Sequence, residues 1–169
     1  MVYENAFSPK ISSRSQNQLM KPETKKILLS YDDDQAWEFP HDFNSKDIEK
    51  RARQVYAELC DKVREPVKFE DWIYNQDASF GLAIVFDPHK HKKSTNIRQL
   101  VIRFSNFGNL ATFSYAGKSL TSTNQTIIES LSRNGFIYVD SSELEEPYDG
   151  VMAPNKTIST WWIRYFDWL

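Results

Sequence analysis

The 169-residue sequence has little cysteine and no long apolar run. Cys60 is its one cysteine, which excludes an intrachain disulfide and a zinc site made of several cysteines. No stretch approaches the ~18 consecutive apolar residues expected of a transmembrane helix, and the first residues lack the apolar segment of a signal peptide. We therefore expect a cytoplasmic protein without a membrane partner.

The sequence also lacks a strong charge of one sign. It carries 21 basic and 23 acidic side chains, for a formal net charge of −2. A general nucleic-acid binder usually has a basic excess. The balance therefore argues against nucleic acid as the main partner, without excluding it.

Catalytic and cofactor motifs are missing as well. There is no GlyXSerXGly, no phosphate-binding GlyXXXXGlyLys, no HisGluXXHis and no glycine-rich dinucleotide turn. His89 and His91 lie in a lysine-rich loop without a third ligand nearby, and the acidic run 32–34 lacks calcium-loop spacing. We interpret both as solvated loops and predict no catalytic residue, metal or cofactor. A small-molecule hydrolase stays open only if the fold forms a deep polar pocket.

Aromatic residues, by contrast, are abundant at 14%, and few of them are needed to fill the core of a small domain. Residues 1–24 are polar and without periodicity, so we expect a partly ordered arm there, followed by one globular domain over 25–169. We predict an α+β fold with a mostly antiparallel sheet of five or six strands and two main helices packed on one face.

Two amphipathic helices and a short helical turn are expected. The first covers 46–64, is capped by Asn44 or Ser45, and has Cys60 buried beside its apolar face. The second covers 123–134, with a capping box at Ser122 and a left-handed C-terminal cap at Gly135. Alternating or continuous apolar patterns predict strands at 25–31, 79–86, 97–104, 110–115, 136–140 and 158–169, and a single helical turn capped by Ser142 opens the segment 141–150.

The segment 158–169 holds three of the five tryptophans. As a strand it places large apolar groups on both faces, which indicates an interior strand with Arg164 paired to Asp167 or to one of residues 32–34. The alternative leaves an exposed surface of aromatic groups and arginine for a partner. Arg103 and Arg164 could also hold an anion together if their strands are neighbours, although internal ion pairs are favoured.

The acidic loop 143–150 is the best candidate for recognition. Negative side chains surround apolar anchors within eight residues, and such a patch steers a basic partner toward it. An ordinary solvated connection is the alternative. The residues predicted to contact a partner are Glu143, Glu145, Glu146, Tyr148 and Asp149.

Three segments together resemble small bacterial immunity proteins: ArgPheSerAsnPheGlyAsnLeuAlaThrPhe (103–113), AsnGlyPheIleTyrValAsp (134–140) and TrpTrpIleArgTyrPheAspTrpLeu (161–169). The resemblance covers about 79–169. It implies a cytoplasmic, non-enzymatic protein that binds a cognate secreted toxin, often a basic nuclease, and blocks its active site. No functional residue carries over from the family.

Two functions therefore compete. The first is an immunity-type inhibitor whose partner is a protein toxin. The alternative is a nucleic-acid or nucleotide-binding module in which a basic loop and exposed aromatic rings form a stacking surface. Its predicted residues are Lys90, Lys92, Lys93, Arg98 and Arg103.

Overall fold

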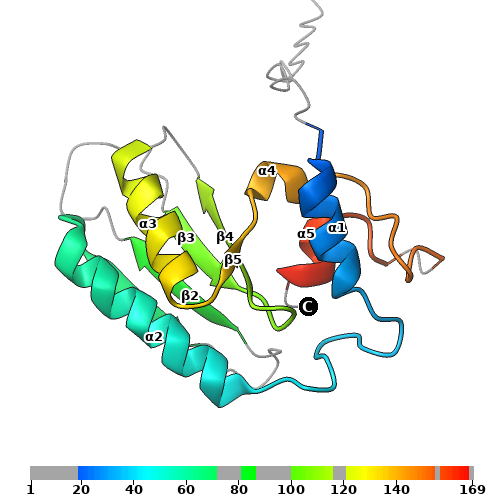
Figure 1. Ribbon diagram of the computed structural model, residues 1–169, viewed down its shortest axis with the longest axis horizontal. Helices are drawn as coiled ribbons and strands as arrows, with labels where there is room; N and C mark the ends of the chain where they lie inside the picture. Colours follow the sequence, from blue (N-terminus) through cyan, green and yellow to red (C-terminus); the bar gives the residue numbers. More distant parts are fainter. Residues whose placement is uncertain (1–18, 72–80, 87–99, 116–120, 155–156, 168–169) are drawn as a thin grey trace, which may run out of the picture.

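A computed structural model describes residues 19–71, 81–86, 100–115, 121–154 and 157–167 (Figure 1). These ranges form an α+β fold, as the sequence predicts. The elements are, in chain order, α1 (Pro22–Ser30), α2 (Ser45–Lys62), β1 (Val67–Asp71), β2 (Leu82–Phe86), β3 (Leu100–Phe104), β4 (Leu110–Tyr115), α3 (Thr121–Arg133), β5 (Ile137–Tyr138), α4 (Ser141–Leu144) and α5 (Trp161–Tyr165).

The sheet has the order β1-β2-β3-β4-β5. The first four strands pair antiparallel, while β5 pairs parallel with β4 after the crossover through α3. The predicted antiparallel run of β2, β3 and β4 is confirmed. The edge strand β1 is an addition that the sequence analysis missed.

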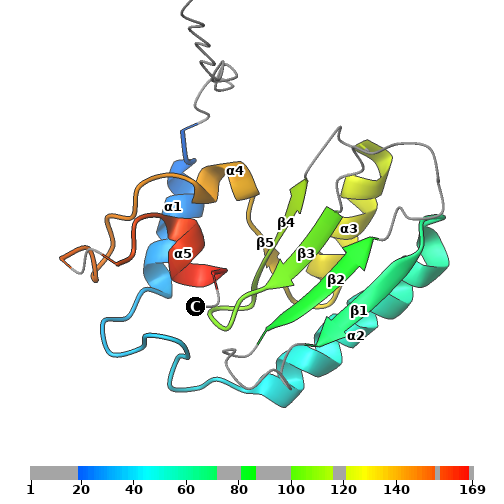
Figure 2. The ribbon, with the colours of Figure 1, turned by 180° about the vertical axis from the view of Figure 1, so that it is seen from behind.

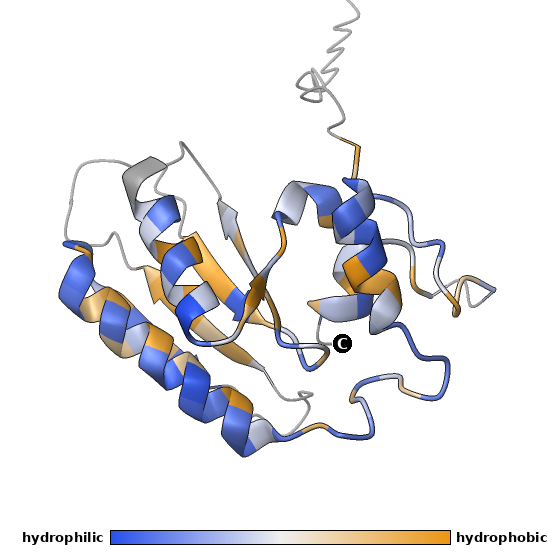
Figure 3. Ribbon diagram, viewed as in Figure 1, coloured by the Kyte–Doolittle hydropathy of each residue, from blue (hydrophilic) through white to orange (hydrophobic). Residues whose placement is uncertain are grey.

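One apolar core lies between the sheet and the helices α2 and α3. Both helices contribute residues to it, and so do alternate positions of β2, β3 and β4 such as Ile84, Ile102 and Phe113. Figures 1 and 2 show these helices on one side of the sheet, and Figure 3 shows apolar residues concentrated in the strands behind them. Alternation along β3 places Leu100, Ile102 and Phe104 inward, as predicted.

A second apolar core lies beside the β4–β5 end of the sheet, among α1, α4 and α5 (Figure 2). Trp161 and Phe166 are fully buried there. The sheet contributes Leu110 and the segment just after β5 contributes Val139, so this helical layer packs on the same sheet as the first core.

Helix boundaries follow the local capping chemistry. The Asn44 side chain accepts a hydrogen bond from the Asp47 amide at the start of α2, and Gly135 adopts φ +76° after α3, as predicted. Helix α3 begins at Thr121, so Ser122 lies inside the helix rather than capping it. Asp140, not Ser142, caps the predicted single turn α4.

Two predicted strands are helices. Residues 25–31 fall mostly in α1, where Pro22 occupies the first turn and Leu28 is buried. The segment 158–169 contains α5, because the Thr160 hydroxyl caps the helix and Trp161, Arg164 and Tyr165 then fall on one buried face. Cys60 is exposed rather than buried, since it lies one position past Leu59 and outside the apolar stripe.

None of the helices within the described ranges combines the length and apolar character needed to cross a bilayer.

Candidate functional site

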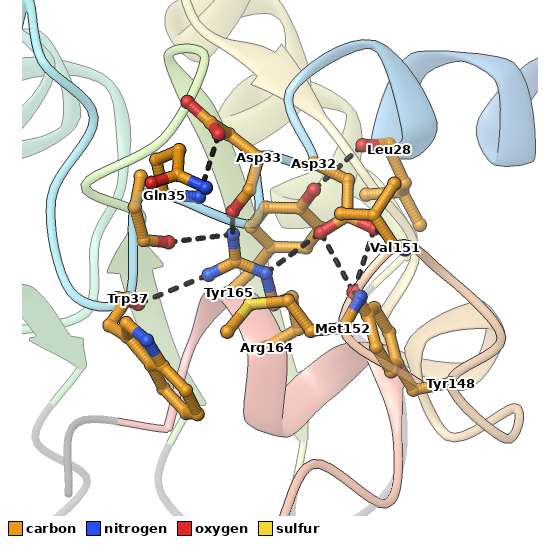
Figure 4. A network of polar contacts seen from close by, with 11 residues as sticks. Leu28, Asp32, Asp33, Gln35, Trp37, Tyr148, Val151, Met152, Arg164 and Tyr165 are labelled. Atoms are coloured by element: carbon orange, nitrogen blue, oxygen red, sulfur yellow. Dashed lines mark hydrogen bonds and ion pairs between the residues drawn. The ribbon is translucent and has the colours of Figure 1, made fainter. Parts of the chain in front are cut away.

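The guanidinium of Arg164 is the centre of a buried polar network (Figure 4). Its Nε donates to Asp32 Oδ1 at 2.9 Å, and the two side chains are 1% and 0% exposed. Its terminal nitrogens donate to the carbonyl oxygens of Asp33, Ala36 and Trp37 at 2.9–3.1 Å. The predicted pairing of Arg164 with residues 32–34 is confirmed, and the interpretation of Asp32 as part of a solvated turn is wrong.

Asp32 also accepts hydrogen bonds from the segment after α4. The Tyr148 hydroxyl donates to it at 2.7 Å and the Val151 amide at 2.8 Å. Burial first, and then the hydrogen bond to the Asp32 carboxylate, raise the pKa of Tyr148 to about 12. Asp32 thus joins the chain after α1, the segment 148–151 and α5.

This network fixes the backbone of residues 33–37. Three carbonyl groups of this segment accept hydrogen bonds from the planar guanidinium of Arg164, so the segment is held in a defined geometry. The Trp37 carbonyl belongs to the network while its indole points away from the guanidinium (Figure 4). Trp37 is 55% exposed, unlike most large apolar residues of the described chain.

A cavity of about 290 Å³ opens beside Trp37, between the segment 37–38, the β3–β4 turn and α5. We call it the Trp37 pocket. Its apolar lining comes from Phe107, Ile158 and Ile163, and two exposed acidic residues, Glu38 and Asp167, also line it. The remaining lining residues are Asn106, Thr157, Arg164 and Tyr165.

The β3–β4 turn is tied to both neighbouring walls of the pocket. The Ser105 hydroxyl donates to the Tyr165 carbonyl at 2.8 Å, and Asn106 Nδ2 donates to the Glu38 carbonyl at 3.0 Å. Asn106 is 6% exposed, and its Oδ1 accepts no hydrogen bond from any described residue. Gly108 at φ +57° lets the turn approach the Tyr31 ring, where a Cβ would overlap.

The predicted contact residues of the acidic loop are divided between interior and surface. Glu143 is buried and accepts from the Lys21 amide and ammonium at 3.0 and 2.9 Å. Burial opposes its charge, but hydrogen bonds from Thr24 and Lys21 lower the pKa of Glu143 overall. Tyr148 is also buried, whereas Glu145 and Asp149 are exposed, Glu146 is half-buried, and Asp149 pairs with Lys25.

The basic loop of the alternative function lies mostly outside the described residues, including Lys90, Lys92, Lys93, Arg98, His89 and His91. Arg103 is described, and its guanidinium lies 5.7 Å from the centre of the Trp162 ring. Burial lowers the pKa of Arg103. Arg164 is fully engaged with Asp32 and backbone carbonyls, so it does not hold an anion jointly with Arg103.

In the described part of the chain, no three histidine, cysteine, aspartate or glutamate side chains gather where a metal ion could bind. Sequence reasoning did not single out Trp37 or Asn106. One sequence-based prediction points toward Trp37, namely the pairing of Arg164 with residues 32–34. That pairing brings the segment after Asp34, which contains Trp37, close to α5.

Comparisons with protein-family models, curated proteins and solved structures found no match to this chain.

Proposed function

We propose that this chain is a non-enzymatic, protein-binding protein that recognises its partner through Trp37 and the Trp37 pocket. In keeping with the resemblance to immunity proteins, the proposed partner is a cognate bacterial toxin whose active site is occluded in the complex. The observation that carries the proposal is an exposed tryptophan on a loop clamped by a buried arginine, directly beside an apolar pocket.

Tryptophan is one of the residues that dominate binding energy in protein interfaces, above all next to a pocket. Ordering a loop on binding reduces affinity, and a loop that is already ordered avoids this loss. The Arg164 hydrogen bonds to residues 33–37 provide that order before any partner arrives. Exposure and prior order together favour recognition over a purely structural role.

Charge supports a basic partner. Glu38 and Asp167 lie at the pocket, Glu145 and Asp149 are exposed on the acidic loop, and the chain has a net charge of −2. Acidic surfaces accelerate encounter with a basic protein and make it sensitive to salt. Glu143 and Tyr148, which form internal contacts, contribute by holding the loop.

The test is to search the neighbouring genes for a secreted toxin, to purify it, and to measure its binding to this protein by titration calorimetry. We expect Trp37→Ala to weaken the complex at least 10-fold, which corresponds to about 1.4 kcal/mol. Leu29→Ala is the matched control, because Leu29 is an exposed apolar side chain on α1 that does not line the pocket. It should leave affinity unchanged.

A Glu145→Lys/Glu146→Lys variant tests the acidic loop. It should slow association and flatten its salt dependence. Equal affinity of wild type, Trp37→Ala and the charge-reversed variant, or no complex with the neighbouring toxin, would contradict the proposed function.

A further inference from the structure

We infer that the Trp37 pocket accepts an arginine side chain from the partner. The inference rests on the proposed function for the origin of that side chain, but the chemistry of the pocket is argued from its own residues. It specifies the group that the partner must present.

The size of the cavity allows a single long side chain to enter. Sites for drug-sized ligands start at roughly 300 Å³, and the Trp37 pocket has about 290 Å³. Its apolar walls at Phe107, Ile158 and Ile163 suit the aliphatic part of a long side chain. The exposed indole of Trp37 offers a flat face at the edge of the same cavity.

The charge of the pocket favours a cation. Arg164 lines the cavity, but its charge is compensated by the buried carboxylate of Asp32 and by three carbonyl oxygens. Glu38 forms no ion pair with another described residue, whereas the charge of Asp167 already interacts with that of Arg103. Glu38 is therefore the main anionic residue that the pocket can offer an incoming cation, and Asp167 adds to the negative charge around it.

Arginine meets these conditions better than lysine. A guanidinium stacks on an indole face and forms paired hydrogen bonds with a carboxylate, whereas an ammonium is a strongly hydrated point charge. A guanidinium brings five N–H donors, and an anion brings none.

The experiment uses the full chain and short peptides. Acetyl-Gly-Arg-Gly-amide is titrated into ¹⁵N-labelled protein, and the indole N–H resonance of Trp37, assigned with Trp37→Phe, is followed by NMR. We expect a saturable shift. Replacing arginine by citrulline, its neutral isostere, should weaken binding at least 10-fold, and replacing it by lysine at least 3-fold.

Variants of the protein locate the interaction. Glu38→Gln/Asp167→Asn should weaken the arginine peptide at least 5-fold. The control Asp34→Asn/Glu145→Gln removes the same charge from exposed positions outside the pocket and should leave the affinity unchanged. Unchanged amide spectra of both variants show that the fold is retained.

Three results would overturn the inference: an unshifted Trp37 resonance, equal binding of arginine and citrulline peptides, or equal weakening by the two double variants. Equal binding of the lysine peptide would also overturn the choice of arginine. Peptide binding needs no toxin, so failure of the proposed function leaves this result interpretable. A toxin complex without peptide binding would reject the inference alone.

Discussion

Arg164 is the residue whose loss should affect the protein most. Replacing it with methionine leaves the Asp32 carboxylate buried without its cation, and three carbonyl groups lose their donor. Breaking a buried ion pair in this way costs about 3–5 kcal/mol. We expect a loss of this size for Arg164→Met in the free energy of unfolding, measured with urea.

The second substitution Asp32→Asn tests the cause. Because it removes the uncompensated charge, Arg164→Met/Asp32→Asn should be more stable than Arg164→Met alone. A double variant as unstable as the sum of the two single variants would show that the charge is not the source of the effect.

Glu58 of α2 gives the fold a defined response to acid. It accepts from Arg133 at 2.8 Å, and also from Asn134 and Ser130 at the end of α3. These hydrogen bonds, that of Arg133 above all, lower its pKa from 4.5 to about 2. Because the pKa is lower in the folded state, its stabilising effect is complete above about pH 5 and is lost as the pH falls toward 2.

The wild type should therefore be more stable than Glu58→Gln near neutral pH, and this difference in stability should decrease in acid. We expect the difference in unfolding free energy between the two proteins to shrink by about 1–2 kcal/mol between pH 6 and pH 2.5, after allowance for partial exposure. Urea unfolding at several pH values measures it. A difference that stays constant with pH would reject this assignment.

Helix α5 depends on the cap at Thr160. Its hydroxyl accepts from the Ile163 amide at 3.3 Å. Because α5 has only five residues, this single hydrogen bond is a large part of what stabilises the helix. Thr160→Ala should cost about 1 kcal/mol in thermal or urea unfolding. Ser159→Ala, at an exposed neighbouring position, should change stability by less than about 0.5 kcal/mol. Equal effects of the two would show that the cap is unimportant.

Elements with a long, regular apolar pattern could be predicted, whereas the short elements α5 and β1 could not. Helix α2 repeats its apolar stripe over 18 residues, and β2 to β4 alternate or are fully apolar. Helix α5 is short and rich in aromatic residues, a composition that favours strands, so its cap and its packing decide its structure. Strand β1 has only two apolar residues, as an edge strand can, and gives little signal.

The candidate site was harder to predict for a different reason. Arg164 and Asp32 lie 132 positions apart, and Asn106 and Glu38 lie 68 positions apart. The sequence offered Asp32 as one of several partners for Arg164, but it contained no local pattern that brings Trp37 to the β3–β4 turn. The acidic loop had a local pattern, yet only the fold reveals that Glu143 and Tyr148 point inward.

The two apolar cores should unfold together. Both cores pack against the same sheet, because β4 contributes Ala111 and Phe113 to the first core and Leu110 to the second. We expect urea curves from far-UV circular dichroism, which reports all helices, to superimpose on those from tryptophan fluorescence. In a Trp72→Phe/Trp168→Phe background the remaining Trp37, Trp161 and Trp162 lie on the α5 side, so separate curves would mean that the α1–α4–α5 layer unfolds by itself.

The long separation between Asp32 and Arg164 also orders events during synthesis. A ribosome adding about 5–20 residues per second makes Arg164 roughly 7–26 s after Asp32. Until then the loop that carries Trp37 has been translated but lacks the guanidinium that holds its carbonyls. The nascent chain is therefore unable to form the clamped loop, and the recognition proposed for Trp37 would have to wait until α5 has left the ribosome.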